Sequence, residues 1–231
     1  MRFLEDLLNI IYPRLCSNCG EALTKNEELL CFSCRSQLPR ISFSDFLENE
    51  LVDRFYGKLD IKYAAALLYF YKSGITQNIM HQFKYKGHLE IGVLFGKWLG
   101  FELVAQAATD DIDLIVPVPL HPKKQRKRGY NQSHHIAQGL SDITNIPTGF
   151  DLLIRVKYQK SQTQKSKEQR WQNVKDAFEL LPIKGKEGVS GKHILLVDDI
   201  ITTGATLEAC GRLLLENNAA KISIATIALA K

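Results

Sequence analysis

Two kinds of apolar pattern alternate along most of the chain. Short apolar runs bounded by polar or turn residues predict buried strands, and stretches with apolar residues three or four positions apart predict helices. We expect strands at residues 62–71, 113–118, 192–197 and 221–229, and helices at residues 75–85, 89–107, 131–141 and 205–215. Because strands and helices alternate, this order predicts an α/β fold with a mostly parallel sheet flanked by helices.

The first part of the chain lacks this alternation. Apolar residues at helical spacing within residues 3–11 predict a short docking helix that ends before Pro13. Residues 35–60 mix serines, charges and Pro39, which is typical of a linker. We therefore expect two units. Residues 1–50 would hold the docking helix, a cysteine module and a linker, and residues 51–231 would form the larger domain.

The composition, with 45% hydrophobic and 24% charged residues, is that of an ordinary globular protein rather than a disordered one. The formal net charge of +5 favours anionic partners such as phosphates or nucleic acid. No apolar run approaches the ~18 residues that a membrane helix needs. The N-terminal stretch contains Glu5 and Asp6 and lacks a small-residue cleavage site, which excludes a signal peptide. We therefore expect a cytoplasmic protein without membrane insertion, in a reducing compartment.

Four of the five cysteines form two C-x2-C pairs separated by eleven residues: Cys16, Cys19, Cys31 and Cys34. Each pair can offer two thiolates to one ion, and disulfides are disfavoured in a reducing compartment. Four sulfur ligands indicate a structural zinc ion with no open position for water, and an iron–sulfur centre or a redox pair is the alternative. Cys210 stands alone in a predicted helix, where we expect it to be buried by packing.

The segment HILLVDDIITTGATLEAC places two acids at the end of an apolar strand and a threonine-rich turn directly after them. Backbone N–H groups at a helix N-terminus bind phosphate, and a glycine lets the backbone approach it. Adjacent aspartates, in contrast, accept hydrogen bonds from vicinal hydroxyls. A ribose 5-phosphate supplies both features. The expected contacts are Asp198 and Asp199 for the diol, and Thr202, Thr203, Gly204, Ala205 and Thr206 for the phosphate.

Three alternatives share parts of this pattern. An NTPase strand ending in acids would need a G-x-x-x-x-G-K-[ST] loop, and the nearest candidate, residues 92–98, is one residue short and is better explained as a packed helix face. A response-regulator receiver would need most of a domain after Asp199. If the two aspartates only capped the following helix, the threonines would have no explanation.

The string LLVDDIITTGAT resembles the phosphoribosyl pyrophosphate (PRPP) fingerprint of the type I phosphoribosyltransferases. Together with the paired cysteines, KYKG at residues 84–87, and residues 116–133 and 170–178, the chain resembles the ComF/GntX family. That family includes competence and DNA-uptake proteins and amidophosphoribosyltransferase-like proteins. The resemblance implies a type I phosphoribosyltransferase fold with an N-terminal zinc module. It also implies transfer of phosphoribosyl from PRPP to an unidentified acceptor, with release of pyrophosphate and Mg2+ bound alongside PRPP.

The resemblance also assigns roles to residues. A pyrophosphate loop would contain Arg128, Gly129, Asn131 and Gln132, and a hood closing over the ligand would contain Arg155, Lys157, Gln162 and Arg170. Lys86 or Arg128 would stabilise charge developing on the pyrophosphate, so the catalytic set is Lys86, Arg128, Asp198 and Asp199. Relatives usually carry a second arginine in place of Lys157, which weakens any bidentate contact assigned there.

A second class of function stays open. Residues 123–128 hold five cations, more than one pyrophosphate needs, and Tyr130 and Trp171 lie in basic segments. The alternative is therefore a protein that handles single-stranded DNA, with a regulatory or vestigial PRPP site. Other DNA-uptake proteins and a second copy of the chain are further candidate partners.

Overall fold

The structure is a computed structural model that describes residues 12–42, 46–156, 177–181 and 188–231. The docking helix predicted within residues 3–11 lies outside these residues. None of the described helices combines the length and the apolar character that crossing a membrane requires.

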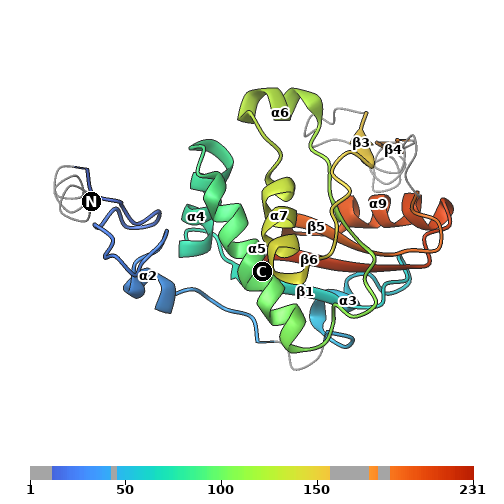
Figure 1. The fold of residues 1–231 in the computed structure, drawn as a ribbon, viewed down its shortest axis with the longest axis horizontal. Coiled ribbons are helices and arrows are strands. Elements are labelled where there is room, and N and C mark those ends of the chain that lie inside the picture. Colours follow the sequence, from blue (N-terminus) through green and yellow to red (C-terminus); the bar gives the residue numbers. More distant parts are fainter. Residues whose placement is uncertain (1–11, 43–45, 157–176, 182–187) are drawn as a thin grey trace.

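A four-stranded parallel sheet forms the centre of the molecule (Figure 1). Its strands lie in the order β1 (Ala64–Phe70), β6 (Lys221–Ala230), β5 (His193–Ile201) and β2 (Leu114–Pro117). Every neighbouring pair is parallel. These strands are apolar along most of their length because both faces of the sheet are covered. The predicted α/β fold with a parallel sheet is confirmed.

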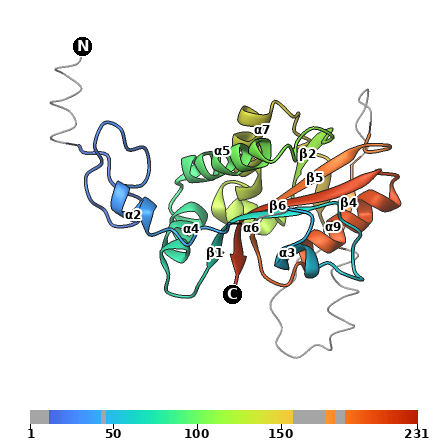
Figure 2. The same ribbon diagram turned by 90° about the horizontal axis from the view of Figure 1, so that it is seen from below.

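Two hydrophobic cores lie on opposite faces of this sheet. Along β5, Leu195 and Val197 join the core made with α4 (Ile75–Tyr85), α5 (Leu89–Ala105) and α7 (Gln132–Thr144). The alternate residues Ile194 and Leu196 join the core that includes α9 (Ala205–Glu216). Figure 2 shows the same arrangement, with α5 and α7 on one side of the sheet and α9 on the other. The alternation of side chains along a strand therefore divides the apolar residues between the two layers.

Helices α5 and α7 pack through glycines at very short range. A Cβ atom on Gly96 would lie 2.3 Å from the Ile136 carbonyl oxygen, and one on Gly139 would lie 2.1 Å from the Val93 carbonyl oxygen. Any side chain at these positions would push the helices apart. The stretch 92–98 is therefore a helix face packed against a neighbour, as predicted, and not a phosphate-binding loop.

The linker predicted at residues 35–60 is wrong for the described part of that segment. Leu38, Phe46 and Leu51 are buried, and residues 39–41 run antiparallel to β1, with the Ile41 amide 3.0 Å from the Leu67 carbonyl oxygen. A short helix, α3 (Glu50–Asp53), follows and is capped by Asn49. The polar residues between these apolar ones hid the pattern, because they face solvent while their neighbours cover the edge of the sheet. The domain boundary at residue 50 stays a prediction.

Two further segments differ from the expected loops. Residues Pro122–Arg128 form a helix, α6, after β2, with Pro122 in its first turn and Gly129 ending it at a φ of +85°. Strand β5 continues to Ile201 rather than ending at Val197. The two aspartates therefore belong to the last part of the strand.

The cysteine module docks on α4 and α5. It contains a short helix, α2 (Phe32–Ser36), and the Trp98 ring of α5 lies 4.9 Å from the Arg35 guanidinium and 5.1 Å from that of Arg40. The Asn78 side chain of α4 donates to the Asn18 side chain at 3.4 Å. Cation–π contacts of this kind favour a fixed docking geometry. The cysteine module and α4 are consequently neighbours, as Figures 1 and 2 show.

Candidate functional site

The predicted site lies where β2 and β5 end. These strands are parallel neighbours, with Pro117 opposite Val197, so their carboxyl ends meet at one edge of the sheet. The chain runs from β2 into α6 and from β5 into a turn and then α9. In open parallel sheets ligands bind outside such an edge. The fold therefore brings together the two segments that the sequence assigned to phosphates.

Asp198 and Asp199 are held in different ways at this edge. The Asp198 Oδ1 atom accepts hydrogen bonds from the Ser133 hydroxyl at 3.1 Å and the Asp199 amide at 2.8 Å. The Asp199 Oδ2 atom lies 2.7 Å from the Lys84 ammonium, and both of these side chains are mostly buried. Burial, and then the neighbouring Asp199 charge, raise the pKa of Asp198 to about 7, against the opposing effect of the Asp199 amide, Lys84 and Ser133. One carboxyl of the pair therefore changes its charge near neutral pH.

The turn after β5 has the geometry of an anion site. Gly204 precedes α9 with a φ of +82°, a conformation that favours glycine, and offers no side chain to cap the helix. The Ala205 amide is 3.4 Å from the Thr203 hydroxyl. The positive end of the α9 dipole lies at this turn, which favours an anion there.

The segment that follows α6 is arranged around Arg128. Its guanidinium donates to the Gln132 Oε1 atom at 2.8 Å and lies 5.2 Å from the centre of the Tyr85 ring. Asn131 caps α7 through the Ser133 amide and donates to the Val118 carbonyl oxygen at 3.0 Å. The pyrophosphate candidates Arg128, Gly129, Asn131 and Gln132 thus lie together where α6 ends and α7 begins.

Three buried side-chain atoms within the described residues have no hydrogen-bond partner: Gln132 Nε2, Arg155 Nε and Thr226 Oγ1. Thr226 lies opposite Asp198 in the sheet. Arg155 is in β3 (Leu153–Arg155), which pairs with β4 (Phe178–Leu180), and Asp198 is among the charges that act on it. Burial lowers the pKa of Arg155. Buried polar atoms without a partner are costly, so those of Arg155 and Thr226 near Asp198 are typical of a site that receives an anionic or polar ligand.

Several expected residues take other places. Lys86 is exposed at the end of α4, whereas Lys84, two positions earlier, contacts Asp199. The hood residues Lys157, Gln162 and Arg170 lie outside the described residues.

Cys210 is fully buried in α9, which confirms its predicted packing role. Two contacts of the acid pair, Lys84 and Ser133, were not expected from the sequence. The KYKG string contains two lysines and does not say which one faces the sheet, and Ser133 reaches Asp198 from a distant part of the chain.

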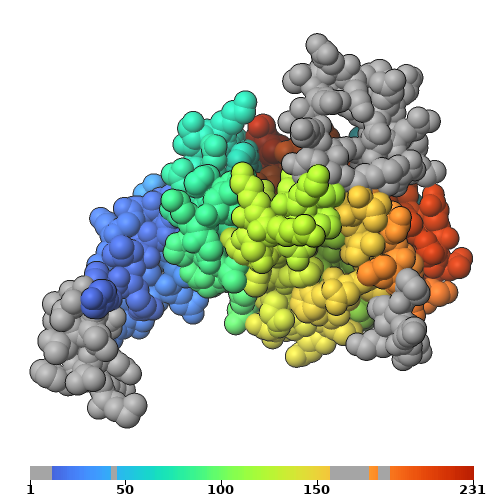
Figure 3. All heavy atoms as spheres, turned by 90° about the horizontal axis from the view of Figure 1, so that it is seen from above, coloured from blue at the N-terminus to red at the C-terminus, as the bar shows by residue number. Residues whose placement is uncertain are grey.

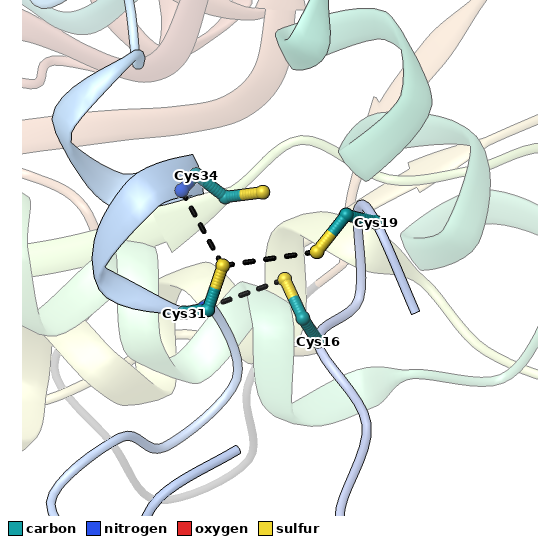
Figure 4. Close-up of side chains that lie close together, drawn as sticks. All are labelled: Cys16, Cys19, Cys31 and Cys34. Carbon is teal, nitrogen blue, oxygen red and sulfur yellow. Dashed lines mark hydrogen bonds between the residues drawn. The ribbon is translucent and has the colours of Figure 1, made fainter. Parts of the chain in front are cut away.

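The four cysteines of the two pairs converge (Figure 4). Their sulfur atoms all lie within 4.8 Å of one another, and the Cys19 and Cys31 sulfurs are 3.7 Å apart. Four thiolates placed tetrahedrally around a zinc ion at about 2.3 Å would be separated by about 3.8 Å. The donor set and its spacing therefore fit a closed zinc site.

Amide groups surround these sulfurs. The Cys31 amide donates to the Cys16 sulfur at 3.3 Å, the Cys34 amide to the Cys31 sulfur at 3.4 Å, and the Asn18 side chain to the Cys34 sulfur at 3.2 Å. Burial acts to raise the pKa of the Cys16 thiol, but backbone donors at Cys19, Cys31 and Asn18 lower it to about 6. Such donors stabilise thiolates, the form that binds a metal.

Residues 126–231 match the phosphoribosyl transferase domain family. The DNA utilization protein YhgH of Escherichia coli K12 is 32% identical over 150 residues, which are 63% of this chain and 63% of that protein. Competence protein F of Haemophilus influenzae is 28% identical over 209 residues, covering 86% and 90% of the two chains. Competence protein ComFC of Bacillus subtilis is 28% identical over 219 residues, covering 89% and 86%.

The chain is thus similar to the ComF competence proteins over most of its length, and its C-terminal part matches the phosphoribosyl transferase domain. The aligned region spans less than two thirds of the Escherichia coli relative, and most of the two competence proteins. The matched domain contains Arg128, the α7 segment with Ser133, and the whole β5-to-α9 turn. The region that matches the phosphoribosyl transferase domain therefore includes both segments that meet at the site. The cysteine cluster lies outside the matched domain.

The acid pair predicts an unusual response of stability to pH. The folded state raises the pKa of Asp198 from 3.8 to about 7, so it binds this proton more tightly than the unfolded chain. That contribution to stability is fully present below pH ~4 and is lost as the pH rises to ~7. Asp198→Asn keeps an oxygen acceptor for Ser133 but carries no charge. We expect it to be more stable than the wild type by about 1–3 kcal/mol at pH 8, with a smaller difference at pH 5.

Urea unfolding of both proteins at the two pH values measures this difference. Asp60→Asn, which neutralises an exposed carboxylate, is the matched control and should change stability little at either pH. If Asp198→Asn increased the free energy of unfolding equally at pH 5 and pH 8, the pKa of Asp198 would not be raised in the folded protein.

Proposed function

We propose that this chain is a member of the ComF family that binds PRPP at the carboxyl edge of its sheet and transfers the phosphoribosyl group to an acceptor, with release of pyrophosphate. One observation carries the proposal. A mostly buried acid pair at the end of β5 is followed within five residues by an uncapped glycine turn that opens α9. Carboxylates repel a phosphate. An acid pair next to a phosphate-binding turn therefore suits a ligand that presents hydroxyls to the carboxylates and a phosphate to the turn.

The ribose 5-phosphate part of PRPP matches these two halves. Asp198 and Asp199 would accept hydrogen bonds from the vicinal hydroxyls, and the Thr202–Thr206 backbone with its hydroxyls would bind the 5-phosphate. Hydrogen bonds from a ligand diol would stabilise the charged form of Asp198 and so lower its raised pKa on binding.

The leaving group would face the segment that follows β2. Arg128 is already oriented by Gln132 and Tyr85, and Gln132 Nε2 and Arg155 Nε are buried donors that have no acceptor among the described residues. As the bond between the ribose C1 and the pyrophosphate oxygen breaks, the electron pair leaves with pyrophosphate, and the two arginines and the Gln132 amide stabilise the charge. The acceptor forms the new bond to C1 and loses a proton. Mg2+, bound with PRPP, would add Lewis-acid stabilisation of the same leaving group.

The names of the relatives suggest the setting. Competence and DNA utilization proteins point to a role for this chain in the uptake or use of DNA. The acceptor would then be a nucleobase, a nucleotide or an amine encountered in that process. A screen of these classes for PRPP-dependent release of pyrophosphate would identify it.

The acid pair provides the direct test of PRPP binding. We expect Asp198→Ala combined with Asp199→Ala to lose measurable binding of PRPP in calorimetry with Mg2+, because both diol contacts disappear. The charge-matched control, Asp60→Ala with Glu102→Ala, removes two exposed carboxylates elsewhere and should bind as the wild type does. Undiminished affinity of the site variant would refute the PRPP site.

The cysteine cluster is the second part of the proposed function, as a structural zinc site that holds the N-terminal module together. We expect Cys31→Ser to lose about one equivalent of zinc and to expose the module to proteolysis, because three thiolates close the site less well. Metal analysis with limited proteolysis measures both effects. Cys210→Ala removes a buried thiol outside the cluster and should keep its zinc. Full zinc content in Cys31→Ser would count against the site, and iron with visible absorbance would favour the iron–sulfur alternative.

A second function, handling of single-stranded DNA, is supported by the surface of α6. This helix presents Lys123, Lys124, Arg126 and Lys127 on an exposed face, and the Tyr85 ring beside Arg128 is 56% exposed. Figure 3 shows α6 across the face of the molecule seen from above. Basic side chains beside an aromatic ring suit a strand of nucleic acid.

We expect Arg126→Gln with Lys127→Gln to weaken binding of an oligo(dT) probe and to lower its salt slope by about 1–2, because two phosphate contacts are lost. Fluorescence anisotropy at several salt concentrations measures this slope. Lys58→Gln with Lys221→Gln removes equal charge outside α6. Equal slopes for both pairs would show that α6 is not the DNA surface.

A further inference from the structure

The segment between the cysteine module and β1 contacts the phosphate turn and α9 at three points, although about 150 residues separate them in the chain. Arg54 donates a hydrogen bond to the Thr202 carbonyl oxygen. The Phe55 ring lies where a Cβ atom on Gly204 would be 3.1 Å away, and Leu59 lies 2.5 Å from the equivalent position on Gly211. Turn and segment are therefore packed against each other over several residues.

This segment is itself fixed to the sheet. The Asn49 side chain donates to the Ala64 carbonyl oxygen of β1 at 3.0 Å and accepts from the Leu51 amide at 2.9 Å. Leu51 and Phe55 are almost completely buried. Arg54 lies between them on a short helical stretch, so its position relative to the sheet is set by the core and not by its own contacts.

The Arg54 guanidinium joins two chain segments. One of its terminal nitrogens reaches Thr202 at the start of the turn, and the other donates to the Ala230 carbonyl oxygen at the end of β6 at 2.8 Å. The planar guanidinium offers separate donors in a fixed geometry, which suits two carbonyls on different chain segments better than a single ammonium does. In a trans peptide the C=O and the following N–H point in opposite directions, so fixing the Thr202 oxygen toward Arg54 turns the Thr203 amide away from it.

We propose that Arg54 is a positioning residue for the phosphate turn. It holds the Thr202 peptide so that the amides that follow point to the 5-phosphate, and it places a permanent positive charge one peptide from that phosphate. The inference rests on the proposed function, since it takes the turn to be the 5-phosphate site. Arg54 acts through Thr202 and makes no contact with PRPP itself.

The test compares Arg54→Lys, Arg54→Gln and Arg54→Ala with the wild type in PRPP titrations with Mg2+. Loss of a charged donor predicts affinity about 10-fold weaker or more for the Gln and Ala variants. Lysine keeps the charge but lacks the planar fork of donors, so Arg54→Lys should fall between these variants and the wild type. Lys58→Gln is the matched control. It removes a neighbouring cation that donates to the Arg54 carbonyl oxygen, and it should bind within about twofold of the wild type.

Hydrogen exchange without PRPP separates positioning from general damage. In Arg54→Gln we expect faster exchange of the amides in residues 202–206, with β5 residues 194–197 unchanged. Wild-type affinity or unchanged exchange in both the Gln and Ala variants would overturn the role of Arg54, as would equally faster exchange throughout β5. If wild-type protein binds no PRPP, the proposed function fails, and the exchange result alone still decides whether Arg54 holds the turn.

Discussion

The site depends on two neighbouring carboxylates that the fold keeps together at the end of a buried strand. Asp199 is neutralised by Lys84. Asp198 has hydrogen bonds from Ser133 and the backbone, and no cation among the described residues lies within ion-pair distance of it. Burial and the neighbouring Asp199 charge therefore both disfavour the ionised form of Asp198, whose pKa rises to about 7. An arrangement that costs stability in the folded protein is typical of a group kept for a ligand.

Elements from distant parts of the chain supply the groups around this pair. Helix α4 provides Lys84, α7 provides Ser133, and β3 brings Arg155 close enough for the Asp198 charge to act on it. The close glycine packing of α5 against α7 fixes one of these helices, and Arg54 and Phe55 fix the turn from the opposite layer. Each of the two layers covering the sheet thus positions one half of the site.

The cysteine module is connected to the same framework. Asn18 donates to the Cys34 sulfur and accepts from Asn78 on α4, the helix that ends with Lys84. Trp98 holds the module against α5. A metal bound by the cysteines would therefore stabilise a unit that lies against the same helix that carries a contact of the acid pair.

The sequence by itself determined the parallel α/β fold, most helix and strand ranges, the four-cysteine cluster and the segments that meet at the carboxyl edge. These features follow from local periodicity and from short motifs, in which neighbours along the chain carry the signal. The packing of the layers sets which lysine reaches Asp199 and that Ser133 supports Asp198. It also buries Leu38, Phe46, Leu51, Phe55 and Leu59 in the core, with Arg54 at the turn. Such contacts join residues tens to more than a hundred positions apart. Which side chains meet then depends on how the layers pack, a property that no local pattern contains.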